Sequence, residues 1–525
     1  MDLTNKPTPG VFINEINAFP NSAVGVPTAI PAFIGYTPQA LHEGKSYLNV
    51  PVKITSFADF QDIFCLPDHP LSASPPKQYS PEYYLVQQKS QPEKGDYILI
   101  FESYYSIAPD PYTIYYLYNS VKLFYENGGG ESYIVSVGTY GPPSKKPMDI
   151  GTQIVNPNVT LTDILAGLQL LMHEPEPTLY ICPEATLLSI SENGELMENM
   201  LLQCTQMQTA MSIFDIIGGN DPDPILYTQD IENFRINTGS VGLNYGIVYY
   251  PFIGTDIMQK QDIDYINLFG GDVKQLGSII NPASHPNPDI AAIIANIQNP
   301  ASTLTTTQNN NALLNASLDY SYIIKEVERI ASILPASGAI AGVITMTDNQ
   351  EGPWQAPANK SIIGAISLPI KISESQQANL NVDVVSGKSI NAIRVFNELG
   401  ILIWGARTLD GNSQDWKYIP VRRTMIFIEQ SCKLAAQAYI FQPNDKNTWE
   451  AVKLSIGNFL TDVWKQGGLQ GASASDAFSV DCGLGTTMTG EDILNGYMTI
   501  SIKVAVAHPA EFIVITLQQK MESAS

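Results

Sequence analysis

The spacing of apolar and polar positions predicts a layered α/β protein. Residues 51–65 give a short strand and then a helix, in which Phe57, Phe60 and Phe64 share one face and Ser56 is the N-cap. Three units then follow in which an amphipathic helix precedes a strand, and this alternation favours a partly parallel sheet. The helices and strands of these units are predicted at 115–127 and 132–137, at 161–172 and 178–181, and at 196–207 and 210–216.

Two stretches show no clear period. Residues 66–111 are rich in Pro, Ser, Gln and Tyr, so we expect a long surface excursion there. Residues 256–318 form a second irregular stretch, and their polar tract 302–311 is expected to be a loop or linker. A helix is predicted at 320–332, followed by a stretch at 335–348 that is rich in Gly and Ala.

The last third of the chain returns to regular patterns. Strands are expected at 390–396, 401–404, 478–482 and 496–505, and helices at 420–439 and 446–465. The fold class is therefore α/β or α+β, with a mixed sheet in the C-terminal part and an α/β domain before it.

Two further strands are predicted near the termini, at 11–16 and 511–517. The first is tied to the body by the Pro-, Gly- and Ser-containing stretch 20–31 and has few local partners. An unpaired strand edge is a template for another chain, so both strands are candidates for pairing between subunits. Pairing within their own chain is the alternative. The residues assigned to this role are Val11, Phe12, Ile13, Asn14, Glu15, Ile16, Glu511, Phe512, Ile513, Val514 and Ile515.

Composition restricts the function classes. The 525 residues include only 15% charged residues, against a usual ~25%, as expected of a surface largely covered by partners or of a glycosylated one. The net charge of -23 disfavours nucleic-acid binding, which needs clustered Lys and Arg. The charge is uneven: residues 351–525 hold 14 Lys and Arg against 16 Asp and Glu, whereas residues 1–350 hold 14 against 35. Two parts in different surroundings, or an acidic domain beside a neutral one, explain this equally well.

The cysteines and the N-terminus indicate a reducing compartment. The five scattered cysteines contain no CxxC motif and are expected to be free buried thiols. Neither a Sec signal peptide nor a run of ~18 apolar residues is found, so we expect folding in the cytoplasm and no direct membrane insertion.

No motif for catalysis stands out, and neither a cofactor nor a metal is expected. The five histidines are scattered, with no HExxH, Walker A or GxSxG pattern. Gly128–Gly130 follows a helix, which suits a helix end better than a phosphate site. The loop 218–224 has oxygen-bearing side chains that could suit calcium, but its two prolines favour a rigid loop.

Several blocks of the chain together resemble contractile tail sheath proteins. The family pattern PSG-x-x-AG-x-x-x-x-x-D-x-x-x-G-x-x-x-APAN is matched at 335–359, with Ala336 where many members have proline. The opening TPGVFINEI and VPTAIPAFIGYT are also similar to the family's first blocks. The other matching blocks are LN (380–381), NAIRVF (391–396), ILIWGARTL (401–409), Trp416 with Arg422–Arg423, FQPNDKNTW (441–449), 464–482 and HPAEFI (508–513).

This resemblance implies a non-enzymatic structural role. Sheath subunits of the family form six-membered rings that stack helically around an inner tube, and the sheath shortens after a baseplate trigger without using a nucleotide. The resemblance also implies contacts with the tube, the baseplate and a terminal cap, in a phage tail or a released contractile particle. It leaves open a low-copy sheath paralogue near the baseplate or cap. An acidic α/β binding protein or enzyme without a recognisable motif is a further alternative.

The resemblance also suggests a division of the chain. Residues 1–20 and 506–525 would be arms that lend a strand to a neighbour, 21–350 an outer α/β domain and 351–505 a domain facing the tube. Residues 20–31 and 505–510 are candidate hinges. We hypothesise that Lys446, Lys453 and Lys465 touch an acidic tube surface, whereas a solvated helix face is the alternative. Gly338, Gly342 and Gly405 are expected at tight contacts or left-handed turns.

Overall fold

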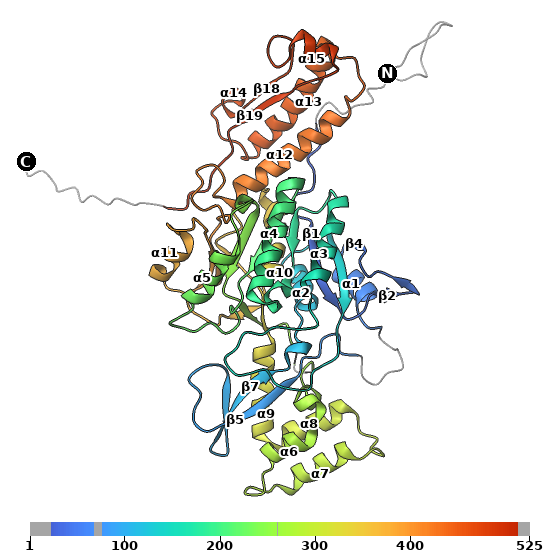
Figure 1. Ribbon diagram of the computed structural model, residues 1–525, viewed down its shortest axis with the longest axis vertical. Helices are drawn as coiled ribbons and strands as arrows, with labels where there is room; N and C mark the ends of the chain where they lie inside the picture. The colour runs from blue at the N-terminus through green and yellow to red at the C-terminus, as the bar shows by residue number, and fades with distance from the viewer. Residues whose placement is uncertain (1–22, 68–75, 260, 513–525) are drawn as a thin grey trace, which may run out of the picture. The chain divides into compact units, whose positions relative to one another are not determined.

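The computed structural model describes residues 23–67, 76–259 and 261–512, which form two compact units (Figure 1). The described part of the larger unit is 27–67, 76–259, 261–426 and 508–512, and that of the smaller unit is 23–26 and 427–507. Helix α12 (Ile419–Gln437) therefore begins in the larger unit and ends in the smaller one.

A nine-stranded mixed sheet forms the centre of the larger unit. Its order is β14-β17-β16-β11-β10-β9-β1-β8-β4, and the strands from β16 to β8 run parallel. All seven residues of β1 are buried, as expected for a strand covered on both faces. The strands are β1 (Pro31–Thr37), β4 (Pro51–Ile54), β8 (Ser132–Thr139), β9 (Leu179–Ile181), β10 (Met211–Asp215), β11 (Gly246–Tyr250), β14 (Lys360–Ser361), β16 (Asn391–Phe396) and β17 (Gly400–Trp404).

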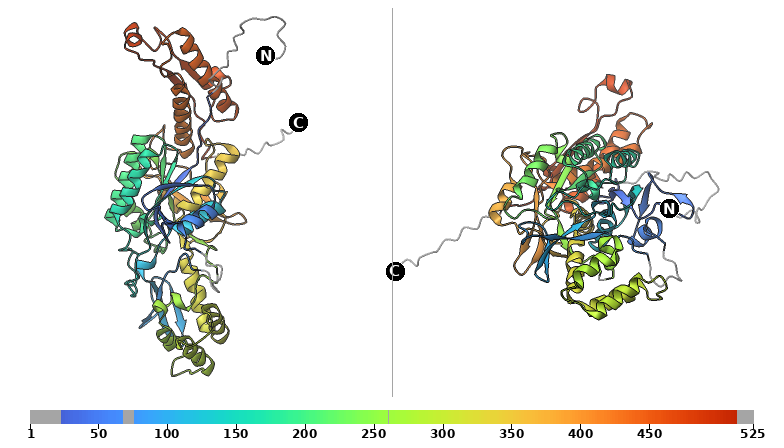
Figure 2. Two further views of the ribbon diagram at one scale, coloured as in Figure 1. Left: turned by 90° about the vertical axis from the view of Figure 1, so that its right-hand side faces the viewer. Right: turned by 60° about the horizontal axis from the view of Figure 1, so that its bottom comes forward.

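Helices cover both faces of this sheet (Figures 1 and 2). On one face Gly167 of α3 lies against Ile34 and Val137, and on the other Phe124 of α2 packs edge-on against Phe33, with ring centroids 5.4 Å apart. The predicted α/β layer with a partly parallel sheet is therefore confirmed. The helices of this region are α1 (Phe57–Phe64), α2 (Leu117–Glu126), α3 (Leu161–Leu170), α4 (Ile190–Met207), α5 (Thr228–Asn237), α10 (Ser337–Glu351) and α11 (Glu374–Asn381).

Helix α10 corrects the prediction for 335–348, which assigned no regular element there. Glycine has a low helix propensity, but this helix packs so closely on α2 that larger residues would not fit. A Cβ atom at Gly338 would lie 2.4 Å from the Ser120 carbonyl oxygen, and one at Gly342 would lie 2.5 Å from that of Phe124. The expected tight contact of both glycines is confirmed.

Buried carboxylates hold the N-termini of both packed helices. Asp215 accepts the backbone N–H groups of Ala336 (2.8 Å) and Ser337 (3.1 Å) at the start of α10, and burial raises its pKa to about 6. Glu184 accepts the N–H of Leu117 at 2.8 Å at the start of α2, and burial raises its pKa to about 7. Both carboxylates satisfy helix N–H groups that have no partner within their helix.

The first predicted excursion, 66–111, contains a sheet of its own. Strands β5 (Tyr83–Gln88), β6 (Tyr97–Ile100) and β7 (Ser103–Pro109) pair antiparallel in the order β5-β7-β6. Tyr83, Leu85 and Ile98 are buried, so this stretch contributes to the core instead of lying only on the surface. The strands were not predicted because their runs of apolar residues are short and are interrupted by many Tyr and Ser residues.

The second stretch, 256–318, is mostly helical. The tract 302–311, predicted to be a loop, contains the start of helix α8, whose N-cap Thr305 forms a capping box with Gln308. Asn310 is buried and accepts a 2.5 Å hydrogen bond from the Tyr320 hydroxyl. The prediction was wrong because these polar side chains find partners inside the fold. The helices are α6 (Val273–Ile280), α7 (Pro288–Gln298), α8 (Thr306–Ala316) and α9 (Leu318–Ala331).

Short strands complete the larger unit. They form a three-stranded sheet in the order β13-β12-β15 and a small hairpin. Their bounds are β2 (Leu41–His42), β3 (Lys45–Ser46), β12 (Ile253–Thr255), β13 (Ile333–Leu334) and β15 (Ala365–Ser367).

The smaller unit combines the later part of α12 with α13 and a two-stranded sheet. Helix α13 has the predicted bounds, 446–465, and Asp445 caps it. The strand expected at 496–505 is shorter than predicted. The remaining elements are α14 (Ala474–Ala477), β18 (Phe478–Asp481), α15 (Gly490–Leu494) and β19 (Ser501–Val504).

The compact units divide the chain at other places than residues 350 and 351. Strands β16 and β17 pair into the large sheet, so 391–404 belongs with the N-terminal strands. Residues 23–26 belong instead with 427–507, where the Ala23 N–H donates to the Ser455 carbonyl at 3.2 Å.

Candidate functional site

The sheet of the smaller unit has the form of a strand acceptor. Strands β18 and β19 pair antiparallel from Phe478 with Val504 to Asp481 with Ser501. Among residues 23–67, 76–259 and 261–512, no third strand joins them. Because a two-stranded sheet is marginal alone and its edges carry unpaired backbone groups, this sheet can accept further strands.

Most of the predicted arm residues lie outside the described part of the chain. This holds for Val11, Phe12, Ile13, Asn14, Glu15 and Ile16, and for Ile513, Val514 and Ile515. Glu511 and Phe512 are described, and neither is part of a strand. Phe512 is 73% exposed, whereas Glu511 is held in the larger unit.

We call the contact that holds it the Glu511 clip, formed by Glu511 with Arg407, Asn381 and Tyr418. The Arg407 guanidinium donates to both carboxylate oxygens, with distances of 3.0 Å from Nε to Oε1 and 2.6 Å from Nη2 to Oε2. Asn381 Nδ2 donates to Oε1 at 2.8 Å, and the Tyr418 hydroxyl donates to Oε2 at 3.3 Å. Burial alone would raise the pKa of Glu511, but the hydrogen bonds from Arg407 and Asn381 outweigh it and hold the pKa below its usual value.

Residues behind the clip fix Arg407 in place. The Asn391 side-chain oxygen accepts the Arg407 backbone N–H at 2.8 Å, and Arg407 Nη1 donates to the Asn381 carbonyl at 3.1 Å. Asn381, Asn391, Arg407 and Glu511 come from four of the sequence blocks noted above, and Tyr418 lies between Trp416 and Arg422 of a fifth. Sequence reasoning assigned only Glu511 to a site. Membership in these blocks was the signal available for the others.

A second pair, Arg423 with Asp348, is buried in the larger unit. The two guanidinium nitrogens donate to the two carboxylate oxygens at 2.6 and 2.5 Å, and the side chains are 4% and 2% exposed. Arg423 also donates to the Thr28 carbonyl at 2.7 Å. The neighbouring Arg422 guanidinium lies over the Trp416 ring, 4.4 Å from its centroid. The Arg422–Arg423 block is therefore occupied with internal contacts.

The three lysines of the predicted tube contact lie along α13. Lys446 and Lys465 are exposed at its two ends. Lys453 is half-buried, and its ammonium group lies 2.7 Å from the Glu450 carboxylate one turn earlier. The exposed ends are therefore the positions where a partner's carboxylates have the readiest access.

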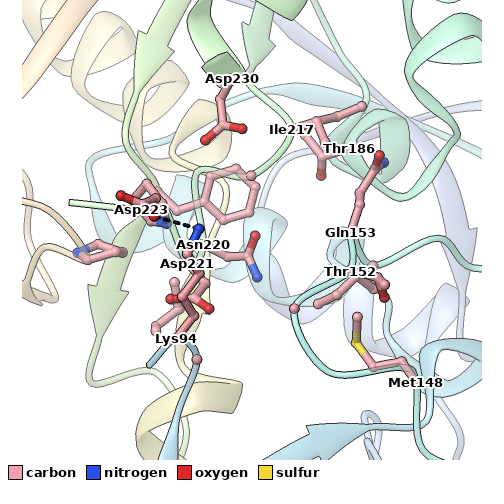
Figure 3. Close-up of a pocket in the computed structure, with 18 of the residues that line it drawn as sticks. Lys94, Met148, Thr152, Gln153, Thr186, Ile217, Asn220, Asp221, Asp223 and Asp230 are labelled. Atoms are coloured by element: carbon pink, nitrogen blue, oxygen red, sulfur yellow. Dashed lines mark ion pairs between the residues drawn. The ribbon is translucent and has the colours of Figure 1, made fainter. Parts of the chain in front are cut away.

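A cavity of about 910 Å³ lies in the larger unit (Figure 3). Asp221, Asp223 and Asp230 are on one side, and Met148, Thr152 and Gln153 are on the other. The Asp223 carboxylate accepts the N–H groups of Ile225 and Leu226 at 2.8 Å and lies 2.7 Å from Lys94 Nζ. Its oxygens thus fix the Pro-containing loop 218–224, which supports the interpretation as a rigid loop.

Further tests for chemistry concern metals, thiols and membrane spans. In the part of the chain that the structure describes, no group of three or more His, Cys, Asp or Glu is placed to hold a metal ion. All five cysteines are buried and free, as predicted. None of the described helices has the length and apolar character needed to cross a bilayer.

Part of the chain is similar in sequence to phage tail sheath proteins. Residues 412–520 match the phage tail sheath C-terminal domain. A tail sheath protein of Vibrio phage KVP40 is 27% identical over 139 residues, which are 26% of this chain and 20% of that relative. A putative prophage major tail sheath protein of Pseudomonas aeruginosa is 28% identical over 138 residues, 25% of this chain and 34% of that relative. The aligned regions thus span a fifth to a third of these relatives.

The fold is shared over almost the whole chain. A chain from the contracted sheath complex of the extracellular contractile injection system PVC aligns with this chain over 99% of each, with 22% identity and a TM-score of 0.58. A chain from the contracted baseplate of the anti-feeding prophage covers 99% of this chain and 100% of its own, with 21% identity and a TM-score of 0.59. The predicted resemblance and the mixed fold class are confirmed.

Proposed function

We propose that this chain is a structural subunit of a contractile sheath, because it has the fold of contractile sheath proteins and its residues 412–520 match the phage tail sheath C-terminal domain. Its subunits would polymerise as stacked six-membered rings around an inner tube and shorten to drive the tube through a target envelope. One observation carries the proposal: the matched region, 412–520, contains the open β18–β19 sheet. The rest of the chain also has the fold of a contractile sheath protein.

The proposed links between subunits are donated strands. Residues 11–16 and the residues after Phe512 would add as strands to the edges of β18–β19 in neighbouring copies, because main-chain hydrogen bonds can join strands of different chains. Such joints survive a large rigid-body movement if the connecting segments absorb the rotation.

The proposed partners are other copies of this chain, an inner tube, a baseplate and a terminal cap. Polymerisation and contraction of this kind need no catalytic site, cofactor or nucleic acid. Assembly would occur in the cytoplasm, before the particle is part of a phage tail or is released. A low-copy ring near the baseplate is the second candidate, because the similar structures include two baseplate assemblies.

Electron microscopy of the chain expressed alone tests the proposal. We expect hollow striated tubes or stacked six-fold rings, because the strand donor and acceptor are on one chain. Short single rings would favour the low-copy role. A variant lacking residues 1–20 should remain dispersed while keeping the thermal unfolding midpoint of the full chain. Dispersed full-length chain, both alone and together with the particle's tube protein, would contradict the sheath proposal.

Charge reversal on α13 tests the proposed tube contact. Exchanging Lys446, Lys453 and Lys465 for glutamate is expected to abolish sheath assembly on the tube, because like charges would then face an acidic surface. Co-sedimentation with tubes measures this. Lys371→Glu, an exposed lysine of the larger unit, is the matched single-charge control and should assemble normally. Normal assembly of the triple variant would exclude the contact.

A further inference from the structure

The chain is fastened twice just before its proposed donor strand. Beyond β19, the Ala505 N–H donates to the Ala477 carbonyl (2.8 Å), and the Ala507 N–H donates to the Gly468 carbonyl (3.2 Å). Four residues after Ala507 the chain reaches the Glu511 clip. The backbone bonds lie in the smaller unit and the clip lies in the larger unit.

The clip is the stronger of the two fastenings. Its guanidinium and carboxylate pair through two charge-assisted hydrogen bonds, which are shorter and stronger than neutral ones. The Arg407 side chain is only 7% exposed and that of Glu511 20%, so water competes little for these bonds. The Asn391 side chain and the Asn381 carbonyl hold Arg407, and the Asn381 side chain donates to Glu511, so both members of the pair are fixed.

The strand that precedes the clip is weakly held. Strand β19 has four residues and four registered partners in β18, and it is on an edge of its sheet. Tension applied at its C-terminal end would break the ladder one pair at a time, whereas tension on the clip must break all the bonds to one carboxylate together. A force applied to the chain beyond Phe512 would therefore separate β19 from β18 unless another contact resists the force first.

We propose that the Glu511 clip is a tension anchor, which diverts force from the donated C-terminal strand into the larger unit and keeps β19 paired with β18. This inference rests on the proposed sheath function, since the force arises only when the segment is bound to a neighbouring copy. With Glu511 held in the larger unit, the donated C-terminal segment would begin at Phe512. Glu511, predicted as part of the donated strand, would then be a positioning residue.

Limited proteolysis of unassembled protein tests the clip independently of assembly. Arg407→Ala should increase the rate at which a glutamate-specific protease cleaves after Glu511 by about tenfold or more, since the charge-assisted pair that holds this side chain is lost. Amide exchange of residues 501–504 should be unchanged, because no tension acts on β19 in a free subunit. An unchanged rate of cleavage after Glu511 would show that the clip does not hold the segment.

Assembly then tests the role of the clip. If wild-type sheaths form, Arg407→Ala sheaths should dissociate at a lower urea concentration and show faster exchange in β19 than wild-type sheaths. The exchanged pair Arg407→Glu with Glu511→Arg should restore much of this resistance. Arg329→Ala, which removes an arginine paired with Asp96 and Glu326 elsewhere in the larger unit, is the matched control.

The outcomes separate the two proposals. Equal urea resistance and equal β19 exchange in wild-type and Arg407→Ala sheaths would overturn the tension anchor and leave the sheath function intact. A wild-type chain that assembles under no condition would remove the sheath function, while the proteolysis result on free subunits would still decide whether the clip holds Glu511.

Discussion

Replacing Asp348 with alanine is expected to lower the free energy of unfolding of the larger unit by about 3–5 kcal/mol, which is typical of breaking a buried ion pair. The substitution leaves the Arg423 guanidinium buried, with the Thr28 carbonyl as a remaining acceptor. A charge with this little compensation in a dry site carries most of its desolvation cost. Urea unfolding of purified protein measures the loss.

Glu351, on the last turn of the same helix, provides the matched control. It pairs with Lys360 where both side chains are partly exposed, so Glu351→Ala should cost less than about 1 kcal/mol. Replacing both buried partners, by Asp348→Leu with Arg423→Met, should recover much of the stability, since well-packed apolar side chains can substitute for a buried pair. A loss for Asp348→Ala no larger than that for Glu351→Ala would contradict this account.

Glu184 is expected to make the protein less stable at pH 8 than at pH 5. Its pKa is raised from 4.5 to about 7 in the fold by burial, so the folded state binds a proton that the unfolded chain releases. The stabilisation by this bound proton is complete below pH 4.5 and is lost as the pH rises through 7. Between these limits the free energy of unfolding falls by about 3 kcal/mol.

The variant Glu184→Gln isolates this effect. Glutamine cannot ionise, and its carbonyl can still accept the Leu117 N–H, so the stability of the variant should fall less between pH 5 and pH 8 than that of the wild type. A smaller fall should remain, because the raised pKa of the buried Asp215 acts in the same direction. Urea unfolding at several pH values gives the slope for each protein. Glu192→Gln, at the exposed capping box of α4, is the control and should keep the wild-type slope. If Glu184→Gln and wild type have the same slope, Glu184 is not the group that titrates.

Helices with a clear apolar face and a polar cap could be predicted from the sequence with nearly correct bounds. Helix α13 is one case, because Asp445 precedes a long amphipathic run, and α1 with its Ser56 cap is another. Helix α8 could not be predicted in this way, since Asn309 and Asn310 are buried polar residues whose partners depend on the fold. Helix α10 was not predicted because its glycines are explained only by close packing against α2.

The Glu511 clip shows why sites formed by distant residues are difficult to predict. Glu511 and Arg407 are 104 residues apart, and no local pattern indicates that they pair. The resemblance singled out both blocks but gave no reason for their presence. The structure supplies one reason, since Arg407, Asn381 and Tyr418 share a single carboxylate.

The smaller unit combines two distant parts of the chain, which leave the ribosome at different times. Its residues 23–26 are synthesised long before 427–507, and the Val26 N–H donates to the hydroxyl of Ser431, 405 residues later. A nascent chain therefore cannot complete this unit until nearly all of the larger unit has emerged. If β18–β19 accepts strands from neighbours, an unfinished chain can offer its N-terminal strand but cannot yet accept one, so the polymer cannot continue on an incomplete subunit.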